Sequence, residues 1–299
     1  MYDLVLYCKS YRRDFLRLKR LLESIQRFNR DRIPFYISTP EADKALLSEF
    51  IGSDGYEWVS DESIVQANPA VQLGIEQKYP GGISQQIIKS EFWRLGTARN
   101  YVCIDSDSVF IQSFTQADFL APDGHPYTVL HQNKDFFQLA TNRGHSRVGQ
   151  QLRTEAERVK QRFGRIGPTY YCAPAPFIWS AMVWQSLDQQ YLLPQGLTLW
   201  DLIGPAYPES IVYGEALLKY HAIPIRAIEP VFRVYHYDWQ YYLLRRLGET
   251  NAKLKQNYLG VIYQSNWELE MGVGDSGKSF LSLLLKRIKR MIRRLQSYR

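Results

Sequence analysis

Asp105 and Asp107 stand one residue apart at the end of the apolar run 101–104. In extended backbone, residues i and i+2 point to the same side, so both carboxylates can face one ion while Ser106 points away. Hard cations such as Mg²⁺ and Mn²⁺ prefer carboxylate oxygens, and Mg²⁺ is usually shared between one or two protein carboxylates and substrate phosphates. The spacing therefore predicts a divalent metal that holds a phosphorylated donor.

The apolar residues on both sides of this acidic pair strengthen the interpretation. Residues 109–111 are again apolar, so two charges interrupt a stretch that otherwise favours burial. Such an interruption costs free energy unless something offsets it, and a bound cation would do so. The alternative is a capped turn after a strand, because two acids at this spacing also occur in ordinary surface turns.

The elements that must position these acids alternate in type along the first third of the chain. Residues 14–28 carry apolar side chains at the spacing of an amphipathic helix, and residues 40–50 read as a second helix. Short apolar runs predict strands at 4–8, 34–38 and 56–59. This strand and helix alternation predicts an α/β fold with a mostly parallel sheet flanked by helices.

A further helix, predicted at 84–95, leads into the strand that ends at the acidic pair. Ligands in open α/β sheets bind beyond the carboxyl ends of the strands. Lys9 and Ser10 follow the first predicted strand, and Ser38 ends the second. We therefore expect these side chains to converge with Asp105 and Asp107 on one edge of the sheet.

The second half of the chain is less regular. A basic helix is predicted at 146–163, and the predicted strands are 127–131, 177–182, 223–228 and 231–237. The body has no internal repeat, and no stretch of Gly, Ser or Pro is long enough to divide it.

Composition excludes several classes of protein. With 45% apolar residues and no low-complexity tract, the 299-residue chain is not disordered. Cys8, Cys103 and Cys172 are odd in number and widely spaced, so they predict buried small hydrophobes rather than disulfides or a zinc site. The first residues lack the pattern of a signal peptide, and no run approaches the roughly 20 apolar residues of a membrane span, which predicts a cytoplasmic protein.

The net charge of +7 is concentrated at the end of the chain. Residues 278–299 hold eight basic residues and no acidic one, whereas the first 277 residues hold 29 basic and 30 acidic residues. Basic residues do not alternate with aromatic ones, so nucleic acid is not the expected partner.

The segment 101–110 resembles the metal motif of GT-A-fold glycosyltransferases, and the chain is similar to bacterial polysaccharide-type transferases of an uncharacterised family. Their pattern combines an early helix that contains Gln and Lys, the two acids and a later Glu-x3-Tyr-Gly segment. The matching residues here are Gln85, Gln86, Lys89, Asp105, Asp107, Glu209, Tyr213 and Gly214. The resemblance covers roughly residues 1–240 and rests mainly on the two acids.

The resemblance implies a GT-A domain at residues 1–265, with a nucleotide-binding half at 1–115 and an acceptor-binding half at 116–265. A glycine hinge and a basic amphipathic tail follow at 266–299. The donor would be a nucleotide-sugar, most simply a UDP-sugar, bound with Mn²⁺ or Mg²⁺. The acceptor would be a saccharide or a lipid-linked sugar in surface polysaccharide or glycolipid synthesis.

The resemblance also implies roles for single residues. Asp107 would be the firmer metal ligand, and Asp105 would contact the donor sugar or ribose with or without the metal. Lys89, or Lys9 and Arg12, would offset charge on the leaving diphosphate, while Ser10, Ser38 and Gln86 would bind the nucleotide. For Lys89 the alternative is a solvated helix face.

His236, near the end of the strand predicted at 231–237, is the expected third metal ligand, since such enzymes often use a late His. An imidazole ligand would favour Mn²⁺ over Mg²⁺. A packed core histidine is the alternative, because Tyr and Trp flank the residue.

Glu209 and Glu215 are the candidate catalytic bases. An inverting transferase, favoured over a retaining one, needs a carboxylate that takes the proton of the acceptor hydroxyl. Glu209 follows Pro208 at a predicted helix start, and its alternative role is a first-turn acid that favours the helix dipole. Several aromatic residues could form a sugar-stacking wall, although their irregular spacing also suits a core: Tyr170, Tyr171, Trp179, Trp184 and Trp200.

Residues 272–279 match the P-loop pattern G-x-x-x-x-G-K-S, with Lys278 and Ser279 as its phosphate-binding residues. A P-loop needs a preceding strand, a following helix and further strands, but 20 residues remain after Ser279. A glycine-rich hinge is therefore favoured over a P-loop nucleotide-binding protein.

Residues 280–299 predict an amphipathic helix with an apolar stripe and a Lys and Arg face. Such a helix binds in the plane of an anionic membrane, and docking on protein is the alternative. The sequence thus predicts a metal-dependent glycosyltransferase peripheral on the inner face of the membrane. A P-loop protein and a non-catalytic membrane adaptor are the competing interpretations.

Overall fold

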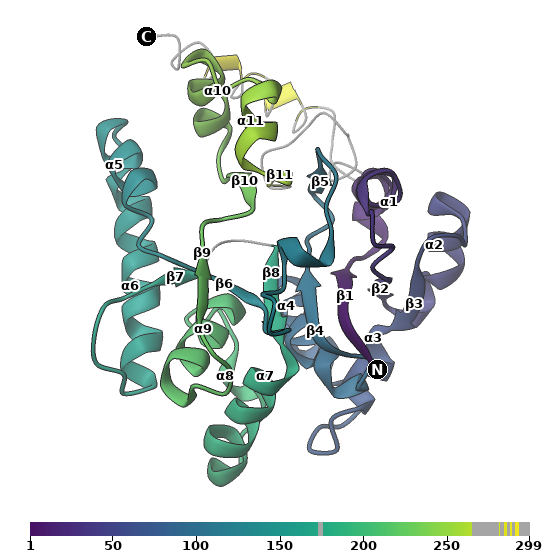
Figure 1. Ribbon diagram of the computed structural model, residues 1–299. Helices are drawn as coiled ribbons and strands as arrows, with labels where there is room; N and C mark the ends of the chain where they lie inside the picture. Colours follow the sequence, from purple (N-terminus) through teal and green to yellow (C-terminus); the bar gives the residue numbers. More distant parts are fainter. Residues whose placement is uncertain (173–175, 265–280, 282–283, 286–287, 289–290, 293–299) are drawn as a thin grey trace.

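The first four strands and the later strand β8 form a sheet of strand order β3-β2-β1-β4-β8 (Figure 1). The computed structural model describes residues 1–172, 176–264, 281, 284–285, 288 and 291–292. The strands of this sheet are β1 (Tyr2–Lys9), β2 (Phe35–Thr39), β3 (Glu57–Ser60), β4 (Ala98–Cys103) and β8 (Phe177–Ser180).

This sheet is parallel from β3 through β4, and β8 joins it antiparallel to β4. Residues 4–8 of β1 are all fully buried, because β2 and β4 flank the strand and helices cover both faces. A continuous apolar run is typical of such a strand. The predicted α/β fold with a mostly parallel sheet is confirmed.

The strand order reverses direction between β1 and β4. The chain first builds β1, β2 and β3 outward on one side, and then crosses back to add β4 on the other side of β1. Ligands of open α/β sheets bind outside the carboxyl ends of the strands at such a reversal. Lys9 ends β1 there, and Asp105 follows β4.

Helices cover the sheet, and further helices occur throughout the second half of the chain. On α1, side chains buried at the spacing i, i+3 and i+7 include Phe15, Leu18 and Leu22. The helices are α1 (Phe15–Phe28), α2 (Lys44–Ile51), α3 (Asp61–Gln66), α4 (Gly81–Glu91), α5 (Lys134–Asn142), α6 (Ser146–Arg162), α7 (Ala181–Leu187), α8 (Leu199–Leu202), α9 (Glu209–Tyr220), α10 (Asp238–Arg246) and α11 (Asn251–Asn257).

Two smaller sheets extend the fold, with strand orders β10-β11-β5 and β7-β6-β9. The acidic pair lies where the chain leaves the main sheet after β4 and enters β5, and the amide of Tyr263 in β11 donates to the carbonyl of Asp107 at 3.1 Å. The strands are β5 (Ser108–Phe110), β6 (Tyr127–His131), β7 (Tyr171–Cys172), β9 (Arg226–Ile228), β10 (Phe232–Tyr235) and β11 (Gly260–Tyr263).

Some predicted boundaries differ from the structure. The strand predicted at 177–182 ends at Ser180, because the Ser180 hydroxyl accepts a hydrogen bond from the Met182 amide and starts α7. Trp179, Trp184 and Trp200 are buried in the core rather than arranged as a sugar-stacking wall. Cys8 and Cys103 are buried free thiols, as expected.

Several predictions fall on residues outside the described ranges. They are the hinge, the P-loop pattern at 272–279 and the basic positions of the tail. The described tail residues are helical and all are apolar, with exposed fractions from 41% for Ile288 to 67% for Leu281. In the described part of the chain, no helix combines the length and apolar content needed to cross a membrane.

Candidate functional site

A cleft of about 680 Å³ opens beyond the carboxyl ends of β1 and β4. Both acids of the pair line it, together with Lys9, so the predicted convergence at this edge holds for these three residues. Its lining is Lys9, Tyr11, Asp14, Pro40, Ala42, Asp61, Glu62, Glu76, Gln77, Gly81, Gly82, Ser84, Gln85, Ile88, Asp105, Ser106, Asp107 and Gln264.

Lys89 links the cleft to α9. Its Nζ lies 3.1 Å from Asp105 Oδ1 and 3.0 Å from Glu209 Oε1. The Lys89 side chain is 5% exposed, and α4 carries it beneath the cleft, so the alternative of a solvated helix face is wrong. Three residues singled out from the sequence, separated by up to 120 positions, thus form one ion-paired group.

The charge of Lys89 is stabilised by its two partners. Burial disfavours the ammonium form, but Asp105 and Glu209 favour it more strongly, so the pKa of Lys89 lies well above its ordinary value. The Asp105 side chain is 35% exposed, against 8% for Glu209. Asp105 therefore lies between the buried cation and the open cleft.

Lys9 makes a second ion pair at the cleft. Its Nζ lies 2.9 Å from Asp61 Oδ2 and donates to the Ser10 carbonyl at 2.9 Å. Burial raises the pKa of Asp61, and the nearby Lys9 ammonium opposes that rise. This pair fixes the first residue of α3 against the end of β1, which holds the wall of the cleft.

Other predicted nucleotide-binding residues do not line the cleft. Ser38 pairs with Lys9 but is buried, and its hydroxyl lies 2.9 Å from the Tyr7 hydroxyl. The Ser10 side chain is also buried. Arg12 points outward to Asp43 at 3.3 Å, and on α4 it is Gln85, not Gln86, that lines the cleft.

Glu215 does not line the cleft. Its carboxylate binds the Arg165 guanidinium through two oxygens, with a distance of 2.8 Å between Arg165 Nη2 and Glu215 Oε1. The glutamate side chain is 2% exposed. The ion pair of Glu215 with Arg165 thus fixes the segment after α6 to α9.

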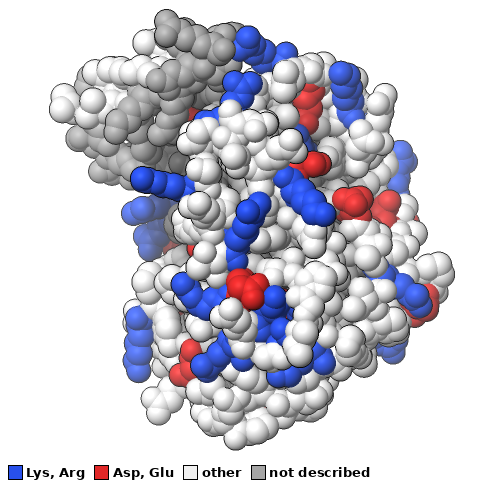
Figure 2. Space-filling model, turned by 90° about the vertical axis from the view of Figure 1, so that its left-hand side faces the viewer, with Lys and Arg blue, Asp and Glu red and all other residues white. Residues whose placement is uncertain are grey.

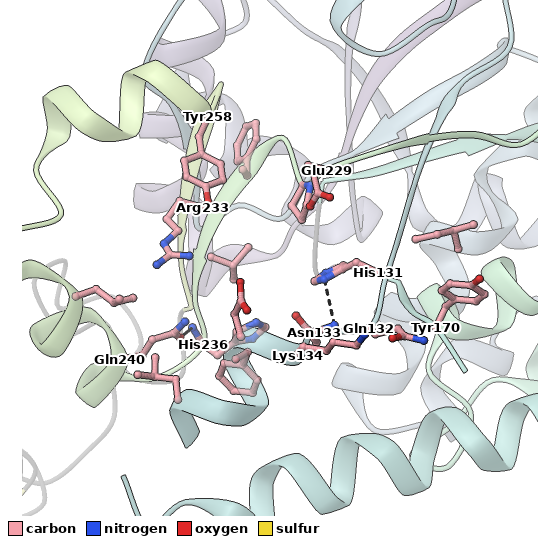
Figure 3. Close-up of a pocket in the computed structure, with 18 residues that line it drawn as sticks. His131, Gln132, Asn133, Lys134, Tyr170, Glu229, Arg233, His236, Gln240 and Tyr258 are labelled. Atoms are coloured by element: carbon pink, nitrogen blue, oxygen red, sulfur yellow. Dashed lines mark hydrogen bonds between the residues drawn. The ribbon is translucent and has the colours of Figure 1, made fainter. Parts of the chain in front are cut away.

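A second cavity of about 650 Å³ lies between β6, α5 and β10 (Figure 3). His131, Gln132 and Asn133 line it from the end of β6, and His236 and Gln240 line it from the β10 side. The His236 ring packs on Phe136 with centroids 5.1 Å apart, and its backbone amide donates to Gln240 Oε1 at 2.9 Å. Tyr170 and Tyr258 add aromatic rings to the lining.

The imidazoles of this cavity are neutral at neutral pH. Burial, the Arg233 guanidinium and His131 lower the pKa of His236 to about 4. Burial also lowers the pKa of His131. Arg233 is held by Glu249 at 2.8 Å, so its charge is paired.

The structure does not bring His236 to Asp105 and Asp107. In the small sheet β11 separates β10 from β5, and the His236 ring faces Phe136 in the second cavity. Within the described ranges, no three His, Cys, Asp or Glu side chains are grouped as a metal site. The expected third ligand is therefore not part of the observed constellation.

Several acids of the cleft were not predicted from the sequence, among them Asp61, Glu62 and Glu76. Asp61 follows the last residue of β3 directly. The rule that selected Lys9 and Asp105, a polar side chain just beyond a parallel strand, would have selected Asp61 as well.

The donor set of the cleft fits a hard divalent cation. Asp105 and Asp107 supply carboxylate oxygens on one wall, and Mg²⁺ or Mn²⁺ commonly binds one or two protein carboxylates and completes its shell with phosphates and water. Lys89 occupies Oδ1 of Asp105, but a carboxylate has a second oxygen. Asp107 and Asp105 are the residues that would hold such an ion.

Comparison with known proteins gives three findings. A solved structure described as a galactosyltransferase, LgtC, in complex with donor and acceptor sugar analogues is similar over 90% of this chain and 91% of that chain, with 11% identity and a TM-score of 0.49. No curated protein matches this sequence. Residues 3–264 match the family described as a family of unknown function, DUF6492, and the chain belongs to that family.

Proposed function

We propose that this protein is a metal-dependent glycosyltransferase with a GT-A arrangement, which transfers a sugar from a nucleotide-sugar. The observation that carries the proposal is the position of Asp105 and Asp107 in a cleft at the strand reversal, the point where such sheets bind nucleotides. The described lining also holds six carboxylates and one lysine. That excess of negative charge favours a cation as part of the ligand.

In this proposal Asp107 and Asp105 would hold Mn²⁺ or Mg²⁺, and the first choice of donor is a UDP-sugar. When bound, the ion supplies Lewis-acid stabilisation of the leaving diphosphate. Lys89 holds Asp105 in place through its 3.1 Å ion pair. Lys9 fixes the opposite wall through Asp61.

Glu209 remains the candidate base of an inverting reaction. Of the two glutamates proposed from the sequence, Glu209 contacts the site through Lys89, whereas Glu215 is bound to Arg165. An inverting transfer needs a carboxylate that accepts the proton of the acceptor hydroxyl. Glu209 at the start of α9 holds Lys89 through Oε1 and its side chain is 8% exposed. It does not line either cavity, so as the base it would have to take the proton at its second carboxylate oxygen.

The second cavity is the proposed acceptor site. It combines aromatic rings with neutral imidazole, amide and phenol groups, which suit the apolar faces and hydroxyl groups of a saccharide. A lipid-linked saccharide would fit the predicted membrane contact of the tail, whose described side chains are apolar and exposed. Surface polysaccharide or glycolipid synthesis is the corresponding process.

A thermal-shift screen of UDP-, GDP-, CMP- and dTDP-sugars, each with and without Mn²⁺, tests the proposal. A ligand that binds the folded state raises stability by RT ln(1 + [L]/Kd). The expected result is one donor class that raises Tm when Mn²⁺ is present and much less without it. If no nucleotide-sugar stabilises the protein under either condition, the proposal is wrong.

A further inference from the structure

Helices α5 and α6 form a strongly basic side of the molecule. Residues 134–165 hold eight Lys and Arg residues and three Asp and Glu residues. The other 245 residues before position 278 hold 21 basic and 27 acidic residues, so the charge of the body is sharply divided. Figure 2 looks onto this side and shows several groups of Lys and Arg side chains across its middle and lower part, with fewer Asp and Glu side chains among them.

Most cations of this surface are not neutralised within the fold. Lys160 pairs with Glu157 at 3.0 Å, and Arg165 binds Glu215. Five other arginines on or beside α6 are exposed, and among the described residues none of them has a carboxylate within salt-bridge distance: Arg143, Arg147, Arg153, Arg158 and Arg162. Of these, Arg153 lies over the ring of Phe137. Such a group of exposed like charges favours a negatively charged partner.

An isolated apolar side chain extends from the same surface. Ile166, directly after Arg165, is 96% exposed. Among the described residues of the range 134–172, Ile166 is the only large apolar side chain that is exposed, and no aromatic residue there is fully exposed. Proteins that bind single-stranded nucleic acid stack bases on aromatic rings, whereas membrane-surface proteins combine cations with aliphatic side chains that enter the interface.

We propose that the α5–α6 surface, defined by Arg143, Arg147, Arg158, Arg162 and Ile166, binds an anionic phospholipid membrane. This contact is separate from the tail and does not depend on the sugar-transfer reaction. The α5–α6 surface lies next to the second cavity, because Lys134 and Phe136 of α5 also line that cavity. A membrane on this side would therefore lie beside the proposed acceptor site.

Co-sedimentation of the full chain with vesicles tests the surface. The vesicles are phosphatidylcholine alone or phosphatidylcholine mixed with phosphatidylglycerol, at low and at physiological salt. We expect binding to the anionic vesicles, weaker binding at higher salt and little binding to the neutral ones.

The test variant replaces the four arginines together: Arg143→Gln, Arg147→Gln, Arg158→Gln and Arg162→Gln. A cation at such a surface contributes about fivefold in affinity, so the partition coefficient should fall at least about tenfold. The matched control removes the same charge from exposed positions on or after α1: Lys19→Gln, Arg27→Gln, Arg30→Gln and Arg32→Gln. This control should bind within about twofold of the unmodified chain, since α1 lies on the opposite side of the molecule.

Three outcomes of the binding assays would overturn the inference. They are equal binding to neutral and anionic vesicles, equal losses in both variants, and tighter binding to a soluble polyanion such as RNA than to anionic vesicles. Ile166→Ser should weaken vesicle binding by about threefold without changing circular dichroism, which separates surface binding from unfolding. The arginine variant should keep the rise in Tm that a nucleotide-sugar donor produces. If it loses that rise as well as vesicle binding, the four arginines act on the proposed enzymatic site and the membrane inference is wrong, whereas the proposed function is not affected.

Discussion

The two cavities of this protein differ most in their charge. The cleft at β1 and β4 is lined by six carboxylates and one lysine among the described residues, whereas the second cavity has two carboxylates, two cations and two histidines. Excess acid favours a metal ion and the diphosphate that completes its shell. A balanced lining with neutral imidazoles and aromatic rings favours an uncharged polar ligand such as a saccharide.

Lys89→Met should have the largest effect, because it removes the buried cation between Asp105 and Glu209. Breaking a buried ion pair on one side leaves uncompensated charge and costs roughly 3–5 kcal/mol of unfolding free energy. Urea unfolding measures this loss. Lys19→Met, on the exposed face of α1, is the control and should change stability by less than about 0.5 kcal/mol. A loss below about 1 kcal/mol for Lys89→Met would mean that this group contributes little to the cleft.

His236 should make the second cavity sensitive to acid. Its pKa is about 4 in the folded protein, below the 6.5 of an ordinary histidine, so the unfolded chain binds the extra proton between these values. Stability therefore falls as the pH drops from 6.5 to 4, by up to about 3 kcal/mol. His236→Asn should flatten this part of the stability profile, while His125→Asn, outside both cavity linings, should not. Identical profiles for both variants would contradict a neutral, buried His236.

Glu215→Gln tests whether Glu215 takes part in catalysis or only stabilises the fold. The change weakens the pair with Arg165 and should cost about 2 kcal/mol of stability, as expected for a hydrogen bond to a charged group. Turnover per folded molecule should stay the same, whereas Glu209→Gln should reduce it. A loss of turnover in folded Glu215→Gln protein would restore Glu215 as a catalytic candidate.

Tyr170→Ala should have the smallest effect and should concern the acceptor alone. Loss of one aromatic contact is worth about 1.4 kcal/mol, which raises the KM for the acceptor about tenfold. Donor hydrolysis without acceptor should be unchanged, because Tyr170 lies in the second cavity and not in the cleft. Steady-state kinetics with the control Tyr2→Ala, an exposed residue of β1, would separate the two effects.

The sequence predicted the elements that rest on local pattern. Strands β1 to β4 and helices α1, α2 and α6 follow from apolar periodicity, and the acidic pair from its place after a buried strand. The sequence did not predict β11, because this short strand exists through pairing with β5 and β10, more than 20 residues away in the chain.

Side-chain direction was the weaker part of the prediction. Ser38 was expected at the ligand edge, but it is buried, its hydroxyl bonds Tyr7 and it does not line the cleft. His236 was expected beside the aspartates, but the β10-β11-β5 order and the ring of Phe136 hold it in the second cavity. The contact of Lys89 with Glu209 joins α4 to α9 and depends on tertiary packing that no local pattern contains.

The most direct test of the central claim is a calorimetric titration of Mn²⁺ into the protein with and without UDP, for the unmodified chain and for Asp107→Asn. We predict weak Mn²⁺ binding alone, at least about tenfold tighter binding when UDP is present, and loss of this coupling in Asp107→Asn. Glu62→Gln, an acid of the same cleft outside the pair, should retain the coupling. If Asp107→Asn binds Mn²⁺ and UDP like the unmodified chain, the acidic pair does not hold a metal and the account is wrong.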